Sequence, residues 1–245
     1  MTESRVLVVE DDEAASYFVT EALEGLDLQV RVCRSVEAAQ EALAAQPVQL
    51  VITDLGFEGA SGFALIHHLR GLPVPPVVIV FSGGLHAAVR EQLASLGVFR
   101  TLAKPASRQE LAHTVRQALN LSDWPEAPNQ ETRLDPTGLK PFELAAIETF
   151  FDGDRTFYET FRASCVEQFA VDLAAGDQAC AAGDAAALRR VAHSLKSVLQ
   201  TLGYADHSVC ARSVEEAAQH RGLPDAATGW QDLRQRIVQS FGLSV

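Results

Sequence analysis

Polar residues that could carry phosphoryl chemistry follow short apolar runs in the first half of this 245-residue chain. Glu10 and Asp11 follow the first run, and Asp54 follows the third. Ser82 ends the fourth run, and Lys104 lies just beyond the fifth. Because the carboxyl ends of parallel strands share one edge of a sheet, we expect these five side chains to converge there.

Converged carboxylates repel one another, and a hard divalent cation such as Mg²⁺ or Mn²⁺ stabilises them through oxygen ligands. The cation and Lys104 would neutralise charge on phosphoryl oxygens, and the Ser82 hydroxyl would donate to one of them. This set suits phosphoryl transfer to the Asp54 carboxylate. A simpler interpretation, with helix-capping acids and a solvated lysine, explains each residue alone but not their coincidence. We do interpret Asp12 and Glu13 as first-turn helix acids.

A histidine in the second half of the chain lies in a predicted amphipathic helix. His193, Lys196, Ser197 and Gln200 recur at helical spacing, so they share a face that we expect to be exposed. The buried stripe beside it is predicted to contain Leu188, Val191, Leu195, Leu199 and Leu202. The imidazole is available as a phosphoryl acceptor, and a lysine one turn along would stabilise the added charge.

The elements around the carboxylates alternate between strand and helix over residues 1–121. Unbroken apolar strands are buried on both faces, which requires a parallel sheet covered by helices, so we predict a doubly wound α/β sheet of five βα units with strand order 2-1-3-4-5. The predicted strands are 5–9, 29–33, 50–53, 77–81 and 98–102. The predicted helices are 13–26, 36–45, 62–69, 86–96 and 109–119.

The periodicity stops in a turn-rich linker at residues 122–140, and residues 141–245 are predicted to form an all-α bundle. Its predicted helices are 142–151, 156–182, 185–202, 205–221 and 226–241. Asp184 is a predicted N-cap, and Gly203 and Gly222 are predicted stops, with Pro224 after the second.

Composition excludes several classes of protein. The net charge of −12 and the lack of a basic run argue against nucleic acid as a partner. The longest apolar stretch is too short for a membrane span, and no export signal precedes it, so we expect a cytoplasmic protein. Four dispersed cysteines indicate neither a disulfide framework nor a zinc site. No glycine-rich ATP loop occurs, so we expect no kinase activity.

The first half resembles the receiver domain of two-component response regulators, which has a flavodoxin-like fold. The motifs are Val8-Val9-Glu10-Asp11-Asp12, Asp54-Leu55-x-x-x-Gly59-x-Ser61-Gly62, Ser82-Gly83 and Lys104-Pro105. The resemblance implies that Asp54 is the phosphoacceptor, that Glu10 and Asp11 are Mg²⁺ acids, and that the Gly56 carbonyl is a further ligand. It also implies a switching hydroxyl at Ser82, a phosphate partner at Lys104 and a cis bond before Pro105.

Two departures from the receiver pattern bear on mechanism. Phe57 and Glu58 stand where the family usually has Met-Pro, and Thr101 stands where it usually has an aromatic residue. In the family that aromatic swings inward as the hydroxyl moves toward the phosphate. Thr101 cannot act in this way, so the chemistry is expected to be intact while the output switch differs.

The second half resembles the histidine phosphotransfer (HPt) domain through Ala192-His193-Ser194-Leu195-Lys196-Ser197 and the later Gly203. Ser197 stands where that motif usually has glycine. The resemblance implies that His193 becomes phosphohistidine.

Together the two resemblances imply a phosphorelay protein that exchanges phosphoryl groups with a histidine kinase or a partner receiver domain. It would be a phosphotransfer protein rather than an enzyme, apart from self-dephosphorylation of the receiver. In an alternative hypothesis the receiver is a docking or homodimerisation platform, and only His193 is phosphorylated. A third hypothesis is a metal-dependent phosphatase with Asp54 as nucleophile, but Gly56 stands where such enzymes usually have a second acid.

Overall fold

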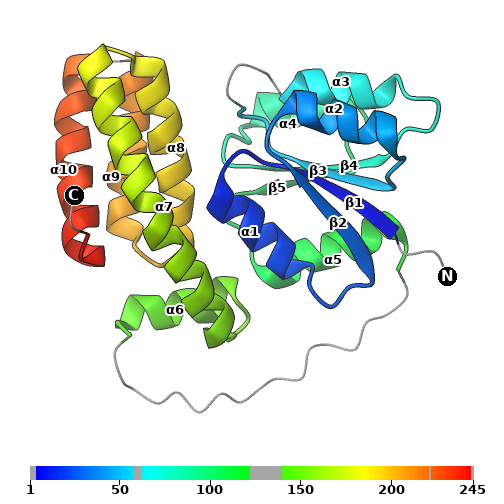
Figure 1. The fold of residues 1–245 in the computed structure, drawn as a ribbon, viewed down its shortest axis with the longest axis horizontal. Coiled ribbons are helices and arrows are strands. Elements are labelled where there is room, and N and C mark those ends of the chain that lie inside the picture. Colours follow the sequence, from blue (N-terminus) through cyan, green and yellow to red (C-terminus); the bar gives the residue numbers. More distant parts are fainter. Residues whose placement is uncertain (1–3, 58–61, 122–138, 221, 244–245) are drawn as a thin grey trace. The chain divides into compact units, whose positions relative to one another are not determined.

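The computed structural model describes residues 4–57, 62–121, 139–220 and 222–243 (Figure 1). The chain divides into two compact units, Met1–Gln130 and Glu131–Val245, and each is described by itself. The predicted linker lies outside the described residues except for its last two positions.

The first unit is built on a five-stranded parallel sheet with the order β2-β1-β3-β4-β5, as predicted. Figure 1 shows α1 and α5 on one face and α2, α3 and α4 on the other. The strands are β1 (Ser4–Val9), β2 (Leu28–Cys33), β3 (Leu50–Thr53), β4 (Val77–Ser82) and β5 (Arg100–Ala103). The helices are α1 (Glu13–Ala22), α2 (Val36–Ala45), α3 (Gly62–Arg70), α4 (Ala87–Ser95) and α5 (Arg108–Leu119).

The central strands are buried on both faces, which is why their sequences read as continuous apolar runs. All four residues of β3 are buried, whereas the edge strand β5 buries only Leu102. The apolar faces of α2 and α3 pack on the sheet through the fully buried side chains of Ala39, Leu65 and Ile66. The doubly wound α/β prediction for the first half is therefore confirmed.

Two predicted boundaries in the first unit are wrong by two or more residues, because turns interrupt the periodic pattern. Helix α1 ends at Ala22 rather than at residue 26, and Gly25 has a φ of 85°, a left-handed conformation that turns the chain. Strand β5 begins at Arg100 rather than at residue 98, because the Val98 amide donates to Leu93 at the end of a turn after α4.

The second unit is all-helical in its described part, as predicted, and Figure 1 shows α6 lying across one end of a bundle of four longer helices. The five helices are α6 (Pro141–Phe150), α7 (Arg155–Ala182), α8 (Ala185–Thr201), α9 (Ala205–His220) and α10 (Leu223–Phe241). The core contains large buried side chains, among them Trp230, Tyr158, Phe161 and Phe169.

The helix boundaries of the second unit follow from its capping residues. Asp184 is the N-cap of α8, as predicted, and its side chain accepts from the Ala187 amide at 2.9 Å. Gly222 follows the end of α9 as predicted, and its amide donates to the Ala217 carbonyl at 3.0 Å. Gly222 is also the N-cap of α10, which begins at Leu223 rather than at residue 226. Pro224 therefore lies in the first turn of α10, where its missing N–H costs no helical hydrogen bond. No helix in the described ranges is long and apolar enough to cross a membrane.

Candidate functional site

The carboxyl ends of β1 and β3 lie side by side because Val9 pairs with Thr53 in the parallel register. The next residues, Glu10 and Asp54, are therefore neighbours at the sheet edge, and only 3% and 5% of their surfaces are exposed. The Lys104 ammonium follows β5 and donates to Glu10 Oε2 at 2.5 Å and to Asp54 Oδ2 at 2.7 Å. The structure thus brings three of the predicted site residues into one buried ion-pair cluster.

Burial and the lysine shift the pKa values of this cluster in different directions. Burial raises the pKa of Asp54, but Lys104 and the hydrogen bonds from Lys104, Ser82 and the Leu55 amide outweigh burial and lower it. Burial raises the pKa of Glu10 well above its usual value despite the nearby lysine. Burial alone would lower the pKa of Lys104, but the two carboxylates raise it. The surroundings therefore favour the ionised form of Asp54 more strongly than that of Glu10.

Backbone groups hold Asp54 in place. Its Oδ1 accepts from the Leu55 amide at 2.5 Å and from the Gly56 amide at 3.4 Å. Gly62 begins α3 directly against this turn, and a Cβ there would lie 2.3 Å from the Asp54 carbonyl oxygen. Glycine at position 62 therefore allows the helix and the β3 turn to approach closely.

The fourth and fifth strands supply the remaining groups of this edge. Ser82 is 2% exposed, and its hydroxyl hydrogen-bonds to the Asp54 side chain and accepts from the Gly84 amide. The Lys104 amide donates to the Ser82 carbonyl at 3.0 Å, so the two strand ends are tied together. The peptide bond between Lys104 and Pro105 is cis.

The remaining acids after β1 have different surroundings. Asp11 is exposed, whereas Asp12 is the N-cap of α1 and accepts from the Ala15 amide at 2.7 Å. Burial raises the pKa of Asp12, and the hydrogen bond from the Ala15 amide and then Lys104 partly offset this rise, so Asp12 belongs to the electrostatic surroundings of the cluster. Asp12 is thus the N-cap rather than a first-turn residue of α1, and it also interacts electrostatically with Lys104 and Asp54, which the prediction did not include. Glu13 forms an exposed ion pair with Arg34 at 3.2 Å.

The donor chemistry of this edge fits a hard divalent cation. Glu10 Oε1 is buried without a hydrogen-bond partner in the described part of the chain, and one lysine faces several carboxylates. No three metal-binding side chains among the described residues are grouped closely enough to hold an ion, and Lys104 pairs with both Glu10 and Asp54. The residues thus fit Mg²⁺ in charge and ligand type, and the lysine occupies the position between the carboxylates.

Of the residues that depart from the receiver pattern, Phe57 and Thr101 have defined surroundings, whereas Glu58 lies outside the described residues. Phe57 is 8% exposed and packs in the core below the β3 turn. The Thr101 hydroxyl accepts from Arg90 Nη1 at 2.9 Å, and Arg90 Nε donates to the Leu85 carbonyl at 3.1 Å. Position 101 is therefore tied to α4 by a hydrogen bond.

The second site lies between α8 and α9. His193 Nδ1 is 2.6 Å from Glu215 Oε1, and Lys196 Nζ donates to Glu215 Oε2 at 2.7 Å. The His193 side chain is 27% exposed, so the predicted exposed face is in fact partly buried, because Glu215 from α9 contacts it. Lys196 also pairs with Glu215, and its Nζ lies 3.3 Å from His193 Nδ1.

Glu215 was not found from the sequence, because no local spacing joins it to a histidine that lies 22 residues earlier on another helix. Burial raises the pKa of Glu215, but hydrogen bonds with His193 and Lys196 outweigh burial and lower it to about 2. Glu215 is thus ionised near neutral pH and accepts the Nδ1 proton of His193. Within the described residues no partner contacts His193 Nε2, so this nitrogen is available as a nucleophile.

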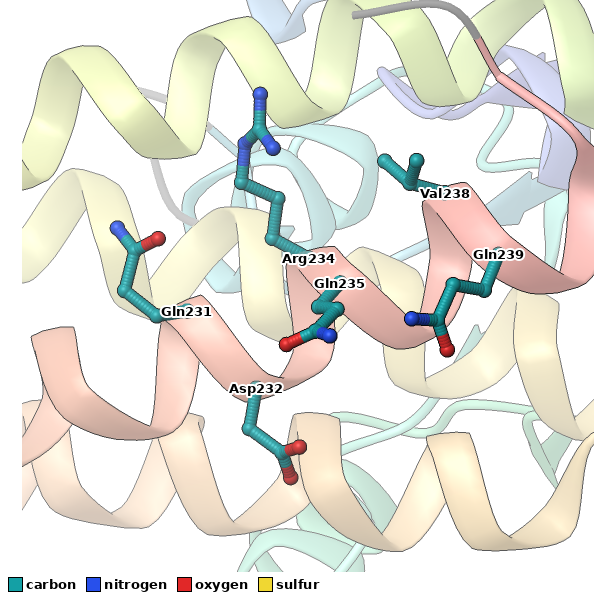
Figure 2. A pocket seen from close by; sticks show the side chains of 6 residues that line it. All are labelled: Gln231, Asp232, Arg234, Gln235, Val238 and Gln239. Carbon is teal, nitrogen blue, oxygen red and sulfur yellow. The ribbon is translucent and has the colours of Figure 1, made fainter.

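A depression of about 530 Å³ lies along α10 and contains none of the predicted site residues (Figure 2). Its charged groups are already paired, because Arg234 donates to Asp177 and Asp232 accepts from Arg236. It is lined by Gln231, Asp232, Arg234, Gln235, Val238 and Gln239.

Each half of the chain matches the model of a known protein family. Residues 6–116 match the family model of the response regulator receiver domain, and residues 158–240 match that of the Hpt domain.

Curated relatives align with about half of the chain. Response regulator protein PilR from Pseudomonas aeruginosa is 31% identical over 129 residues, which is 52% of this chain and 28% of the relative. The regulatory protein KdpE from Escherichia coli is 29% identical over 128 residues, 51% of this chain and 56% of the relative. The alignments thus span between about a quarter and about half of the length of these relatives.

Solved structures also align with about half of the chain. A response regulator receiver protein from Pseudomonas putida has a TM-score of 0.45 and 27% identity, covering 48% of this chain and 98% of that chain. The HemR receiver domain from Leptospira biflexa has a TM-score of 0.46 and 22% identity, and the alignment covers 50% of this chain and 99% of that chain.

Proposed function

Because this chain contains a receiver domain followed by an Hpt domain, we propose that it is a phosphorelay signalling protein that accepts and passes phosphoryl groups through Asp54 and His193. The observation that carries this proposal is the buried lysine that joins Glu10 and Asp54 at the carboxyl edge of the sheet. Phosphoryl transfer to a carboxylate needs an ionised nucleophile beside positive charge, and this edge supplies both.

Asp54 is the proposed phosphoacceptor. Its carboxylate attacks the phosphorus of a phosphohistidine, an O–P bond forms, the P–N bond breaks, and the leaving imidazole nitrogen takes up a proton. Lys104 faces the phosphoryl oxygens, and the Ser82 hydroxyl, now bonded to Asp54, donates to one of them. Glu10, Asp11, Asp54 and the Gly56 carbonyl would hold Mg²⁺ or Mn²⁺, which would neutralise charge on the transferring group when bound.

His193 is the proposed phosphohistidine. Its Nε2 attacks the phosphorus of an aspartyl phosphate, an N–P bond forms, and the carboxylate leaves. The Glu215 carboxylate keeps the Nδ1 proton and stabilises the positive charge that the ring acquires. Lys196 bonds to Glu215, so its proposed role is to hold this carboxylate in place, in addition to the charge stabilisation inferred from its spacing.

The proposed partners are a histidine kinase, a partner receiver domain, or both, and transfer between Asp54 and His193 of one chain is included. The protein would not draw phosphoryl groups from ATP, since its two matched families are phosphotransfer modules. We also propose a cytoplasmic location and no role for nucleic acid or membrane as a partner.

One observation favours a second candidate, in which the receiver is a docking or homodimerisation platform and only His193 is phosphorylated. Thr101 stands at the position where the receiver pattern has its switching aromatic residue, and its hydroxyl accepts a hydrogen bond from Arg90. A receiver without that switch could serve binding alone.

Labelling experiments on the full chain separate these functions. The wild type, the Asp54→Ala and His193→Ala variants and the double variant are incubated with a phosphorylated histidine kinase and, separately, with a phosphorylated partner receiver domain, which donates to histidine. The label is then tested for stability, because acyl phosphate is lost in base and phosphohistidine in acid. Acetyl phosphate with Mg²⁺ tests Asp54 without a kinase. His220→Ala, an exposed position near the end of α9, is the matched control.

The relay predicts base-labile label that needs Asp54 and acid-labile label that needs His193. If Asp54→Ala labels normally and His193→Ala stays blank, the platform function is correct. Undiminished label in the double variant would overturn both.

A further inference from the structure

Ser208 on α9 forms a hydrogen bond to the main chain of a neighbouring helix. Its hydroxyl donates across the helix interface to the Lys196 carbonyl on α8 at 2.8 Å. Thr160, Thr201 and Ser213 instead donate to the carbonyl four residues earlier in their own helices. Ser208 is 2% exposed, so its bond is shielded from water.

The packing of α9 explains why so short a side chain reaches another main chain. The buried face of α9 consists of Ser208, Ala211, Val214 and Ala217, and none of these side chains is large. Small residues let two helix backbones approach, but they leave few protrusions that resist sliding of one helix along the other. A directional hydrogen bond from Ser208 supplies such resistance.

The bond lies close to the histidine site. Lys196 is one turn beyond His193 on α8, and its side chain and carbonyl are both held by α9, through Glu215 and Ser208 respectively. Ser208 and Glu215 are two turns apart on α9, and helical side chains lean toward their own N-terminus. The position of α9 at Ser208 thus sets where the Glu215 carboxylate meets His193.

We propose that Ser208 is a positioning residue for phosphoryl transfer at His193, acting through Glu215. Its bond to the Lys196 carbonyl fixes α9 on α8, so that Glu215 holds the Nδ1 proton and Nε2 remains the nucleophile. The inference rests on the proposed function of His193 and adds the residue that sets the geometry of that site.

The test uses the full chain in an Asp54→Ala background, so that only histidine label is measured. Phosphoramidate, a small N–P donor, is the probe, and acid-labile label on His193 gives the rate. Ring ¹⁵N chemical shifts of His193 across a pH series report its tautomer and titration without any phosphoryl donor. Ser208→Ala removes the hydroxyl, Ser208→Cys retains the volume if the alanine variant folds poorly, and Ser213→Ala is the matched control on the same helix.

We expect Ser208→Ala and Ser208→Cys to slow labelling roughly fivefold, as loss of one ordinary hydrogen bond would, and to shift the His193 tautomer signal. Ser213→Ala should change neither. In a Glu215→Gln background, Ser208→Ala should cause no further loss, because the residue it positions is already altered.

Equal slowing in both backgrounds, or unchanged ¹⁵N shifts in the Ser208 variants, would overturn the positioning role. Failure of the proposed function gives a different result, in which His193 takes no label in any variant. The ¹⁵N series then still decides whether Ser208 positions the ring.

Discussion

Glu215 Oε1 lies 2.6 Å from Nδ1 of His193, so a carboxylate on α9 orients an imidazole on α8. The same carboxylate binds Lys196 through its other oxygen. A histidine held through one ring nitrogen presents the other in a fixed direction, which reduces the orientational cost of attack on phosphorus. The α8–α9 pair therefore contains His193 together with the two described residues that bond to its ring, Glu215 and Lys196.

Glu215→Gln is expected to remove acid-sensitive stability from the bundle. The pKa of Glu215 in the folded protein is lowered to about 2 from its usual 4.5. The carboxylate therefore contributes its full stabilisation of the folded bundle at pH values above its pKa in the unfolded chain, and this contribution is lost as the pH falls toward 2. We expect the variant to be about 2 kcal/mol less stable at pH 6, with the difference vanishing near pH 2. Urea unfolding across this range measures it.

The matched control is Glu216→Gln, an exposed neighbour on the same helix. Its unfolding free energy should follow that of the wild type at every pH. A constant deficit for Glu215→Gln from pH 6 to pH 2 would contradict the lowered pKa.

Lys104→Met is expected to destabilise the receiver unit because it leaves two buried carboxylates without their counter-ion. Loss of one partner from a buried ion pair costs about 3–5 kcal/mol. Lys104 lowers the pKa of Asp54 in the folded protein, so the wild type is more stable than the variant at pH values above the pKa of Asp54 in the unfolded chain. This difference in stability declines as the pH falls below that pKa. Chemical unfolding at pH 7 and at pH 3 measures the difference and its decline.

Arg34→Ala serves as the control, because it breaks an exposed ion pair with Glu13 that we expect to contribute less than about 1 kcal/mol. Equal effects of the two substitutions would show that the Lys104 cluster adds no special stability.

Gly62→Ala is expected to disturb the proposed phosphorylation site through its backbone. The added Cβ would lie 2.3 Å from the Asp54 carbonyl oxygen and 2.7 Å from the Leu55 Cα, so the β3 turn must shift. We expect a loss of about 1–3 kcal/mol in stability, typical of overpacking, together with slower labelling by acetyl phosphate. Gly71→Ala, whose Cβ would approach no atom closer than 3.4 Å, should label at the wild-type rate.

Mg²⁺ is expected to stabilise the receiver unit and to be required for acetyl phosphate labelling. A ligand at ten times its dissociation constant adds about 1.4 kcal/mol of stability, which thermal unfolding with and without EDTA measures. Glu10→Gln and Asp11→Asn should abolish this increment. Glu13→Gln should retain it, because Glu13 pairs with Arg34 outside the cluster. A metal-independent label on Asp54 would refute the role of the cation.

Most of the fold was predictable because it follows from local periodicity. Continuous apolar runs give buried parallel strands, and the i, i+3, i+4 pattern gives helices. The misplaced boundaries lie at Gly25, Val98 and Gly222, where turn and cap geometry override a periodic pattern that continues past the true end. Such geometry depends on which carbonyls are available, and periodicity does not contain this information.

By itself, the sequence determined the two-part architecture, the sheet order and the residues that follow the strands, because parallel topology brings the carboxyl ends of neighbouring strands together. Only the tertiary structure decided the pairing of Lys104 with both Glu10 and Asp54, and of His193 with Glu215. These contacts join residues far apart in the chain. Their distances depend on side-chain burial and on how two elements pack, which no local spacing encodes.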